Sequence, residues 1–267
     1  MNMKSVSKDY ETSDPGVLER TLELLRLLAT AGRSGLALTQ ISDAARLPHS
    51  TAHRLLHRLI AERMVVQRES NKRYVLGPLT FELGLAASRI YDLREPCRPI
   101  LSELAEEIGD TVYLTVRSGT ESVCEDRYEG PAPIRVITLE IGSRRPLGLG
   151  AGGLAILSSL PDAETQQAID HIVQRHGRHR SLDGDALREA VKACKRHGFS
   201  LIRSQVTLGT TAIGVAILDT LDNPIAAISV AAVDSRMSDA RILSLSHQLK
   251  SAATRIRNAI HSLQSHY

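Results

Sequence analysis

The stretch LTQISDAARLPHSTAHRLLHRLIAERMVVQRESNKRYVLG, residues 38–77, decides the fold of the first part of the chain. Its apolar residues recur at helical spacing in two short segments that Leu47-Pro48 separates, and two segments with strand character follow. Thr39 is placed to cap the first of these helices. The two helices and two strands are expected at residues 39–46, 49–63, 64–66 and 73–76. Together with a helix expected just upstream, they predict a winged helix-turn-helix.

The upstream helix is expected at residues 17–30, between Asp14-Pro15 and Gly32. Its apolar residues form one stripe at helical spacing, which is typical of a helix that packs on a core. The members of this stripe are Val17, Leu18, Leu22, Leu25, Leu28 and Ala29.

The second helix of the quoted stretch presents small polar, imidazole and guanidinium groups away from its apolar side. Such a helix fits a DNA major groove, where Arg54 would reach guanine O6 and N7 while Ser50 and Thr51 touch base edges or phosphates. His57 and Arg58 lie one turn further on and are expected at the DNA backbone, and the hairpin cations at phosphates or the flanking minor groove. The predicted DNA-binding residues are Thr39, Ser50, Thr51, His53, Arg54, His57, Arg58, Arg68, Lys72 and Arg73.

Positive charge is concentrated in this same region. The whole chain has a formal net charge of +3, but residues 46–73 alone contain seven arginines or lysines and two glutamates, so the remainder is slightly acidic. A local basic patch is typical of one module that contacts phosphates. The chain has no tryptophan and two phenylalanines, which disfavours a platform that stacks single-stranded bases. The predicted partner is therefore double-stranded operator DNA.

The composition is that of a globular protein without a membrane segment. The 267 residues suffice for one large domain or two ordinary ones, and 42% are hydrophobic and 24% charged. The three cysteines are far apart, which predicts reduced, buried thiols. No signal-peptide core and no apolar run of about 18 residues occurs, so we expect a cytoplasmic protein with no membrane partner.

After the hairpin the pattern changes to helices and strands in mixed order, which predicts an α+β fold. Strict alternation at 111–117 predicts a half-buried strand. Further strands are expected at 121–128, 134–139, 199–202, 212–218 and 225–233, and helices at 100–108, 154–160, 163–176, 185–197 and 241–263. The expected organisation is a flexible arm at 1–14, the winged helix-turn-helix domain at 15–78, a linker helix at 79–95 and a second domain at 96–267.

Two residue clusters suggest chemistry but have simpler explanations. His49, His53 and His57 share one line of a helix, as zinc ligands can, yet Ser50 stands where a zincin motif has glutamate and no carboxylate lies nearby. Cys124 falls within a predicted strand, and no signature of a thiol nucleophile surrounds it. We therefore predict no metal site, no cofactor and no catalytic residue.

The glycine-rich segment PLGLGAGG, residues 146–153, leaves two interpretations open. It is not a phosphate-binding P-loop, because no Gly-Lys-Ser/Thr follows. At the start of a helix, the free N–H groups of Ala151, Gly152 and Gly153 would hold a carboxylate or another oxygen-bearing group of a small ligand. Alternatively, the glycines only allow a helix to approach a sheet closely.

The chain contains four motifs in a fixed order: LPHSTAHRLLHRL, RYVLG, IGSRRPLGLGAGG and IAAISVAAVDSRMS. In order and spacing they resemble the isocitrate-lyase-regulator (IclR) family of bacterial transcription factors over nearly all of residues 17–260. The resemblance implies an N-terminal winged helix-turn-helix and a C-terminal GAF-like effector-binding domain with a mostly antiparallel sheet. It also implies a homodimer, often paired into a tetramer, that a small metabolite controls.

The resemblance further implies which positions wall the effector cavity. They are Ile134, Ile137, Ala151, Gly152, Ile202, Ala212, Ser229 and Ala231. Relatives that bind small polar acids tend to have an acidic residue, a cysteine and a second serine at the positions of Ile202, Ala212 and Ala231, and the family's frequent Glu-Glu is Ser204-Gln205 here. Ser229 and the loop N–H groups would then be the only polar anchors. Because burying a dianion there would be costly, we expect a fairly apolar organic acid or aromatic catabolite with at most one carboxylate or carbonyl.

Other functions stay open at the level of sequence. The pocket could be degenerate and the regulator constitutive, or the protein could be an architectural DNA-binding dimer, which a ligand-sized cavity would disfavour. An enzyme with an accessory DNA-binding module would need paired titratable groups in the pocket, and the predicted pocket strands show none. The favoured function is a DNA-binding transcriptional regulator, repressor or activator, that responds to a small-molecule effector.

Overall fold

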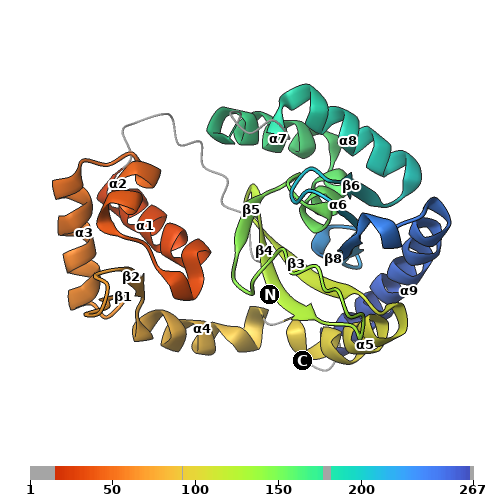
Figure 1. The fold of residues 1–267 in the computed structure, drawn as a ribbon, viewed down its shortest axis with the longest axis horizontal. Helices are drawn as coiled ribbons and strands as arrows, with labels where there is room; N and C mark the ends of the chain where they lie inside the picture. The colour runs from red at the N-terminus through yellow and green to blue at the C-terminus, as the bar shows by residue number, and fades with distance from the viewer. Residues whose placement is uncertain (1–15, 92, 177–181, 265–267) are drawn as a thin grey trace. The chain divides into compact units, whose positions relative to one another are not determined.

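A computed structural model describes residues 16–91, 93–176 and 182–264 (Figure 1). They divide into two compact units, with the division between Ala87 and Ser88, inside helix α4 (Pro78–Tyr91). The arm predicted at residues 1–14 lies outside the described residues. Within the described part of the chain, no helix is both long and apolar enough to cross a membrane.

The N-terminal unit consists of three helices, a two-stranded hairpin and the start of α4. Its elements are α1 (Val17–Ala31), the 3-10 turn η1 (Gly32–Ser34), α2 (Leu38–Ala45), α3 (His49–Ala61), β1 (Val65–Gln67) and β2 (Tyr74–Leu76). β1 and β2 pair antiparallel, and Leu36 bridges to Tyr74 on the other side of β2. The predicted winged helix-turn-helix is confirmed, with boundaries within about three residues of those expected.

The core of this unit lies between α1, α2, α3 and the hairpin. Leu24 and Leu28 of α1, Ile41 of α2 and Leu56 of α3 are buried around Tyr74. The stripe predicted for α1 is wrong at its N-terminal end, because Val17, Leu18 and Leu22 are exposed. The helix inserts only its Leu24–Leu28 turn into the core, and its first turns extend past that core.

The predicted cap of α2 is also wrong. The helix begins after Ala37, whose backbone N–H donates to the side chain of Gln40 at 3.0 Å. This is the glutamine half of a capping box, and it satisfies an N–H group that would otherwise lack a partner. Thr39 therefore lies inside the first turn, with its side chain exposed.

The C-terminal unit is a six-stranded antiparallel sheet in the order β5-β4-β3-β8-β7-β6. Its strands are β3 (Thr111–Ser118), β4 (Glu121–Tyr128), β5 (Arg144–Pro146), β6 (Ser200–Arg203), β7 (Thr210–Leu218) and β8 (Pro224–Val233). Its helices are α5 (Arg94–Ile108), α6 (Ala151–Ser159), α7 (Asp162–His176), α8 (Gly184–His197) and α9 (Asp239–Gln264), with η3 (Asp234–Arg236) before the last. The α+β class and the antiparallel sheet are confirmed.

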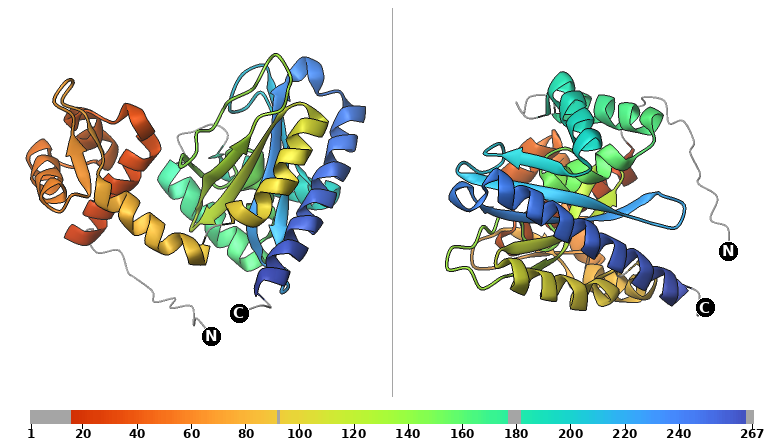
Figure 2. Two further views of the ribbon diagram at one scale, coloured as in Figure 1. Left: turned by 90° about the horizontal axis from the view of Figure 1, so that it is seen from below. Right: turned by 90° about the vertical axis from the view of Figure 1, so that its right-hand side faces the viewer.

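Helices cover both faces of this sheet (Figure 2). Successive side chains of a strand point to opposite faces, so Val112 and Leu114 of β3 pack with α5 and α9. Tyr113 and Thr115 point to the other face, where α6 lies, and they are buried too. The prediction of a half-buried strand at 111–117 is therefore wrong for its first five residues, because each face has its own helical layer.

The predicted strand at 134–139 is also absent. This stretch is a loop whose carbonyl groups bind side chains in place of a neighbouring strand. Tyr113 Oη donates to Val136 O at 2.7 Å, and Arg127 Nη1 donates to Leu139 O at 3.3 Å. Tyr113 Oη also accepts from Thr138 N at 3.0 Å, so one buried phenol holds the middle of the loop. The edge of β4 pairs instead with the short β5.

Candidate functional site

Helix α3 separates its side chains into a buried row and an exposed row. Ala52, Leu55, Leu56 and Leu59 face the core, and the imidazole and guanidinium groups lie on the opposite side. His53, Arg54, His57 and Arg58 are all exposed, as is Ser50, while Thr51 is half-buried. The rings of His53 and His57 stand edge to face with centroids 4.4 Å apart. The exposed face thus has the size and chemistry that a major groove accepts.

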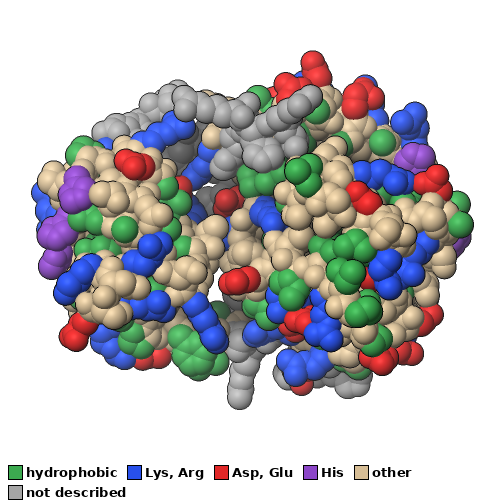
Figure 3. All heavy atoms as spheres, viewed as in Figure 1, with side chains coloured by type: hydrophobic (Ala, Val, Ile, Leu, Met, Phe, Trp, Pro, Cys, Tyr) green, Lys and Arg blue, Asp and Glu red, His purple; other side chains and the backbone are tan. Residues whose placement is uncertain are grey.

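On α3 and in the hairpin, four cationic side chains have no hydrogen-bond or ion-pair partner among the residues that the structure describes. They are Arg54 and Arg58 on α3 and Arg68 and Lys72 in the hairpin. Figure 3 shows lysine, arginine and histidine side chains gathered on the face of this unit that α3 and the hairpin form. An unneutralised group of cations attracts phosphates, and its charge is available without breaking an internal salt bridge.

Arg73 has a different position from the other predicted DNA-binding cations. Its guanidinium donates to Ser34 O at 3.0 Å, to Gly35 O at 3.0 Å and to Gln40 Oε1 at 3.1 Å. These bonds tie β2 to the turn before α2 and to the capping residue of α2. The side chain is therefore used within the domain, where it fixes the hairpin against the helix-turn-helix.

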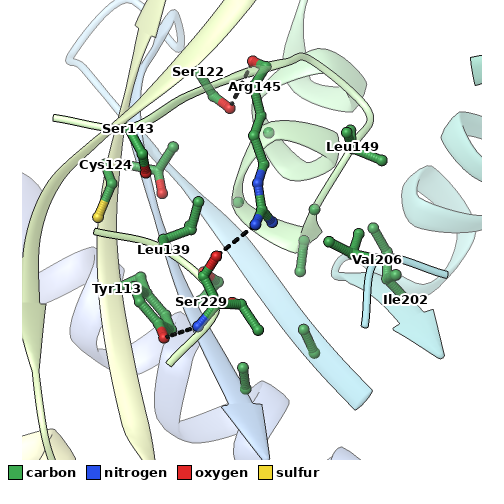
Figure 4. A pocket seen from close by; sticks show the side chains of 18 of the residues that line it. Tyr113, Ser122, Cys124, Leu139, Ser143, Arg145, Leu149, Ile202, Val206 and Ser229 are labelled. Atoms are coloured by element: carbon green, nitrogen blue, oxygen red, sulfur yellow. Dashed lines mark hydrogen bonds between the residues drawn. The ribbon is translucent and has the colours of Figure 1, made fainter. Parts of the chain in front are cut away.

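The second site is a pocket in the C-terminal unit, between the sheet and the N-terminus of α6 (Figure 4). Its cavity volume is about 50 Å³, and the total space between its walls, including open solvent at the mouth, is about 610 Å³. The residues that line it are Tyr113, Thr115, Ser122, Cys124, Thr138, Leu139, Ser143, Arg145, Leu149, Gly150, Ala151, Gly152, Gly153, Ile202, Val206, Thr210, Ala212, Ser229 and Ala231.

Most of the predicted effector-binding residues meet at this pocket. Its wall includes Ala151, Gly152, Ile202, Ala212, Ser229 and Ala231. Ile134 and Ile137 do not reach it, because their side chains are 61% and 51% exposed on the loop that replaces the predicted strand. Thr138 and Leu139 of the same loop line the pocket instead.

The glycines of α6 lie directly against the sheet. The helix begins at Ala151, three residues before the predicted start, so Gly152 and Gly153 form its first turn. A Cβ at Gly152 would lie 2.9 Å from Thr115 Oγ1, and one at Gly153 would lie 3.0 Å from Ser122 Oγ. A side chain at Gly152 would therefore displace Thr115, and one at Gly153 would crowd Ser122. The same close packing brings the helix N-terminus to the pocket wall.

Arg145 is a charged pocket residue that the sequence patterns did not predict. It lies opposite Ser122 in the β4–β5 ladder, and residues opposite each other point to the same face. Its guanidinium Nη2 donates to Thr138 O at 2.5 Å, and burial lowers the pKa of the group. The neighbouring Arg144 is paired with Glu121 at 2.9 Å. Alternation within Arg144-Arg145-Pro146 could have indicated an inward arginine, had this segment been interpreted as a strand.

Several hydroxyl groups also reach the pocket. The Oγ1 of Thr115 and the Oγ of Ser143 are buried and have no hydrogen-bond partner. Burial raises the pKa of the Cys124 thiol to about 12, so this group is a neutral, weakly polar part of the wall. The expectation that Ser229 and the loop N–H groups are the only polar anchors is therefore wrong.

Within the described residues, no group of three or more histidine, cysteine, aspartate or glutamate side chains is arranged to hold a metal ion. His53 and His57 contact each other and solvent. Cys97, Cys124 and Cys194 are buried, and none of them forms a disulfide.

Comparison with known proteins identifies both units. The model of the IclR helix-turn-helix domain matches residues 17–69, and the model of the C-terminal domain of bacterial transcriptional regulator IclR matches residues 86–258. The chain belongs to the IclR family. It is accordingly a DNA-binding transcriptional regulator with a C-terminal effector-binding domain.

The alignments with similar proteins extend over most of this IclR-family chain. It is 28% identical to the HTH-type transcriptional regulator KipR of Bacillus subtilis, over 85% of this chain and 91% of KipR. It is 30% identical to the regulator BhcR of Paracoccus denitrificans, over 88% and 84% of the two chains. An IclR homologue from Microbacterium hydrocarbonoxydans, solved in complex with 4-hydroxybenzoate, superposes with a TM-score of 0.69 at 21% identity, over 92% of this chain and all of that one.

Proposed function

We propose that this chain binds operator DNA through α3 and the β1–β2 hairpin as a homo-oligomer, and that a small organic acid in the pocket beside α6 controls this binding. The observation that carries the proposal is the set of four cations without internal partners on α3 and the hairpin. Arg54 reads a base, while Arg68 and Lys72 contact phosphates. Since its partner is DNA, the protein acts in the cytoplasm.

The test uses a duplex that the purified full-length protein selects from random sequence, next to a random duplex of equal length. Arg54→Ala is expected to weaken binding to the selected duplex about 10- to 100-fold and to remove the preference over the random one. Lys72→Ala is expected to weaken binding to both duplexes alike and to reduce the salt dependence of affinity by about one charge. Lys192→Ala removes an exposed lysine of α8 and should change neither. Equal, sequence-blind losses for Arg54→Ala and Lys72→Ala would contradict the assigned roles.

We propose that a second copy of the chain packs against exposed apolar residues of the N-terminal unit. Val17 and Leu18 at the start of α1 and Phe81 and Leu83 on α4 are all more than half exposed. Exposed apolar patches usually mark interaction sites, and the family resemblance implies a dimer through the DNA-binding modules, often paired into a tetramer. We expect Phe81→Ser with Leu83→Ser to shift the molar mass measured by light scattering towards the monomer. An unchanged mass would refute this interface.

The proposed effector is a fairly apolar organic acid. Leu139, Leu149, Ile202 and Val206 give the pocket apolar walls, and the homologue from M. hydrocarbonoxydans was solved with an aromatic acid, 4-hydroxybenzoate. The neutral thiol of Cys124 supports a role without catalysis. Calorimetry with 4-hydroxybenzoate, benzoate and octanoate against glyoxylate and pyruvate tests the choice. Binding of glyoxylate or pyruvate alone would refute an apolar effector. If none of the five ligands binds and operator binding is intact, the protein would be a constitutive regulator.

A further inference from the structure

The pocket contains a cation that the protein does not neutralise. Arg145 is partly buried, and the one hydrogen bond that its guanidinium makes to the described residues goes to Thr138 O, a neutral carbonyl group. The pocket lining contains no aspartate or glutamate, and the described residues place no carboxylate in ion-pair contact with Arg145. A guanidinium has five N–H donors, so most of its bonding capacity is left unused by the protein. Removing such a group from water is costly unless an anion accompanies it.

A second source of positive potential lies beside this cation. A Cβ at Gly150, the residue that precedes α6, would lie 3.8 Å from Arg145 Nη1, so the guanidinium is next to the N-terminus of the helix. The N-terminus of a helix carries a partial positive charge and unpaired N–H groups. Two positive groups at one wall favour an anion between them more strongly than either does alone.

The rest of the pocket is divided by polarity. Figure 4 shows the guanidinium between Tyr113, Cys124 and Ser143 on one side and Leu149, Ile202 and Val206 on the other. The hydroxyls of Ser143 and Thr115 are buried without partners, so polar hydrogen-bonding capacity is available near the charged end. The other side offers the aliphatic side chains of Leu149, Ile202 and Val206. A ligand that matches this wall has one charged end and one apolar body.

We propose that Arg145 is the counter-ion of the effector and that the pocket selects apolar monocarboxylates by their charge. The carboxylate accepts two parallel N–H bonds from the guanidinium, and the apolar body lies against Leu149, Ile202 and Val206. One positive charge at the wall neutralises one carboxylate, so a dianion would retain an uncompensated buried charge. This inference rests on the proposed function, since it assumes that the effector occupies this pocket.

The experiment compares acids with their primary amides, which have nearly the same shape and no charge. Full-length protein is titrated by calorimetry with benzoate, 4-hydroxybenzoate and octanoate and with the three corresponding amides. Arg145→Gln and Arg145→Lys are measured beside Arg144→Gln, which removes the neighbouring arginine paired with Glu121. A thermal melt of each ligand-free variant reports whether it is folded.

We expect at least one acid to bind wild type and Arg144→Gln equally, its amide to bind at least about 10-fold more weakly, and Arg145→Gln to lose about 10- to 100-fold in affinity for the acid alone. Arg145→Lys should recover part of the loss, because it restores the charge without the paired geometry. Equal binding of acid and amide, or unchanged acid binding by folded Arg145→Gln, would overturn the counter-ion role and leave the proposed function standing. If no acid and no amide binds, both proposals fail for this ligand class.

Discussion

Replacing Gly152 by alanine tests whether the first turn of α6 has room for a side chain. The added methyl group would lie 2.9 Å from Thr115 Oγ1 and 3.5 Å from Ser229 Oγ. Overpacking of a buried contact costs about 1–3 kcal/mol, whereas alanine in place of glycine within a helix gains about 1 kcal/mol. The cost exceeds the gain, because Thr115 is buried on a central strand and its β-branched side chain has few alternative rotamers. We expect a net loss of about 1 kcal/mol in the free energy of unfolding.

The assay is urea unfolding of the full chain followed by circular dichroism. Because the two units can unfold separately, each transition is fitted on its own. Gly84→Ala on α4 is the matched control: nothing lies within 4 Å of a Cβ there, so only the helix-propensity gain of about 0.5–1 kcal/mol remains.

Thr115→Ala completes a double-mutant cycle with Gly152→Ala. Thr115 Oγ1 is buried without a partner, so removing it relieves the crowding and abolishes no hydrogen bond. The double variant should therefore recover most of the loss caused by Gly152→Ala. Stabilisation by Gly152→Ala as large as that by Gly84→Ala, or no coupling between positions 115 and 152, would refute the packing argument.

Three further outcomes follow from contacts within each unit. Arg73→Ala should cost about 1–2 kcal/mol in urea unfolding of the N-terminal unit and weaken DNA binding, because the four hydrogen bonds of its guanidinium to the turn and to α2 disappear. Unchanged unfolding would contradict its anchoring role. Asp110→Asn should cost about 3 kcal/mol in the C-terminal unit, since the buried carboxylate pairs with Arg236 and Arg241; a loss below about 1 kcal/mol would argue against this pairing. Cys124 should resist alkylation by iodoacetamide at pH 8 until the protein unfolds. Because the pKa of this thiol is higher in the folded state than in the unfolded one, the stability that the protonated thiol contributes should disappear as pH rises from 9.0 towards about 12. A Cys124→Ser variant with the same dependence of stability on alkaline pH would exclude the thiol as the cause.

The elements that sequence patterns predicted well are those whose signals are local. In α3, buried residues recur at helical spacing between Ala52 and Leu59, Pro48 precedes the helix, and polar or basic residues fill most of the remaining positions. The hairpin follows from two short β-prone segments around the turn-forming residues Glu69-Ser70-Asn71-Lys72. The DNA-binding unit was therefore visible without long-range information.

The loop at 134–139 shows where such patterns fail. Its apolar residues are spaced as in a strand, but its backbone carbonyl groups accept hydrogen bonds from Tyr113, Arg127 and Arg145. These three residues lie on strands β3, β4 and β5. Side-chain donors from distant segments leave no trace in a local pattern. The inward direction of Arg145 depends in the same way on which residue of β4 it faces, and this register is a long-range property.

The bonds of Arg73 have a consequence for how recognition can change during evolution. Arg73, which binds two backbone carbonyls and one glutamine, and the Leu36–Tyr74 bridge hold the hairpin against the helix-turn-helix. None of these contacts involves Ser50, His53 or Arg54. Substitutions at Ser50, His53 or Arg54 can then alter the preferred bases while the spacing of phosphate contacts is conserved. The residues that position the hairpin are thus different from the residues that contact the bases.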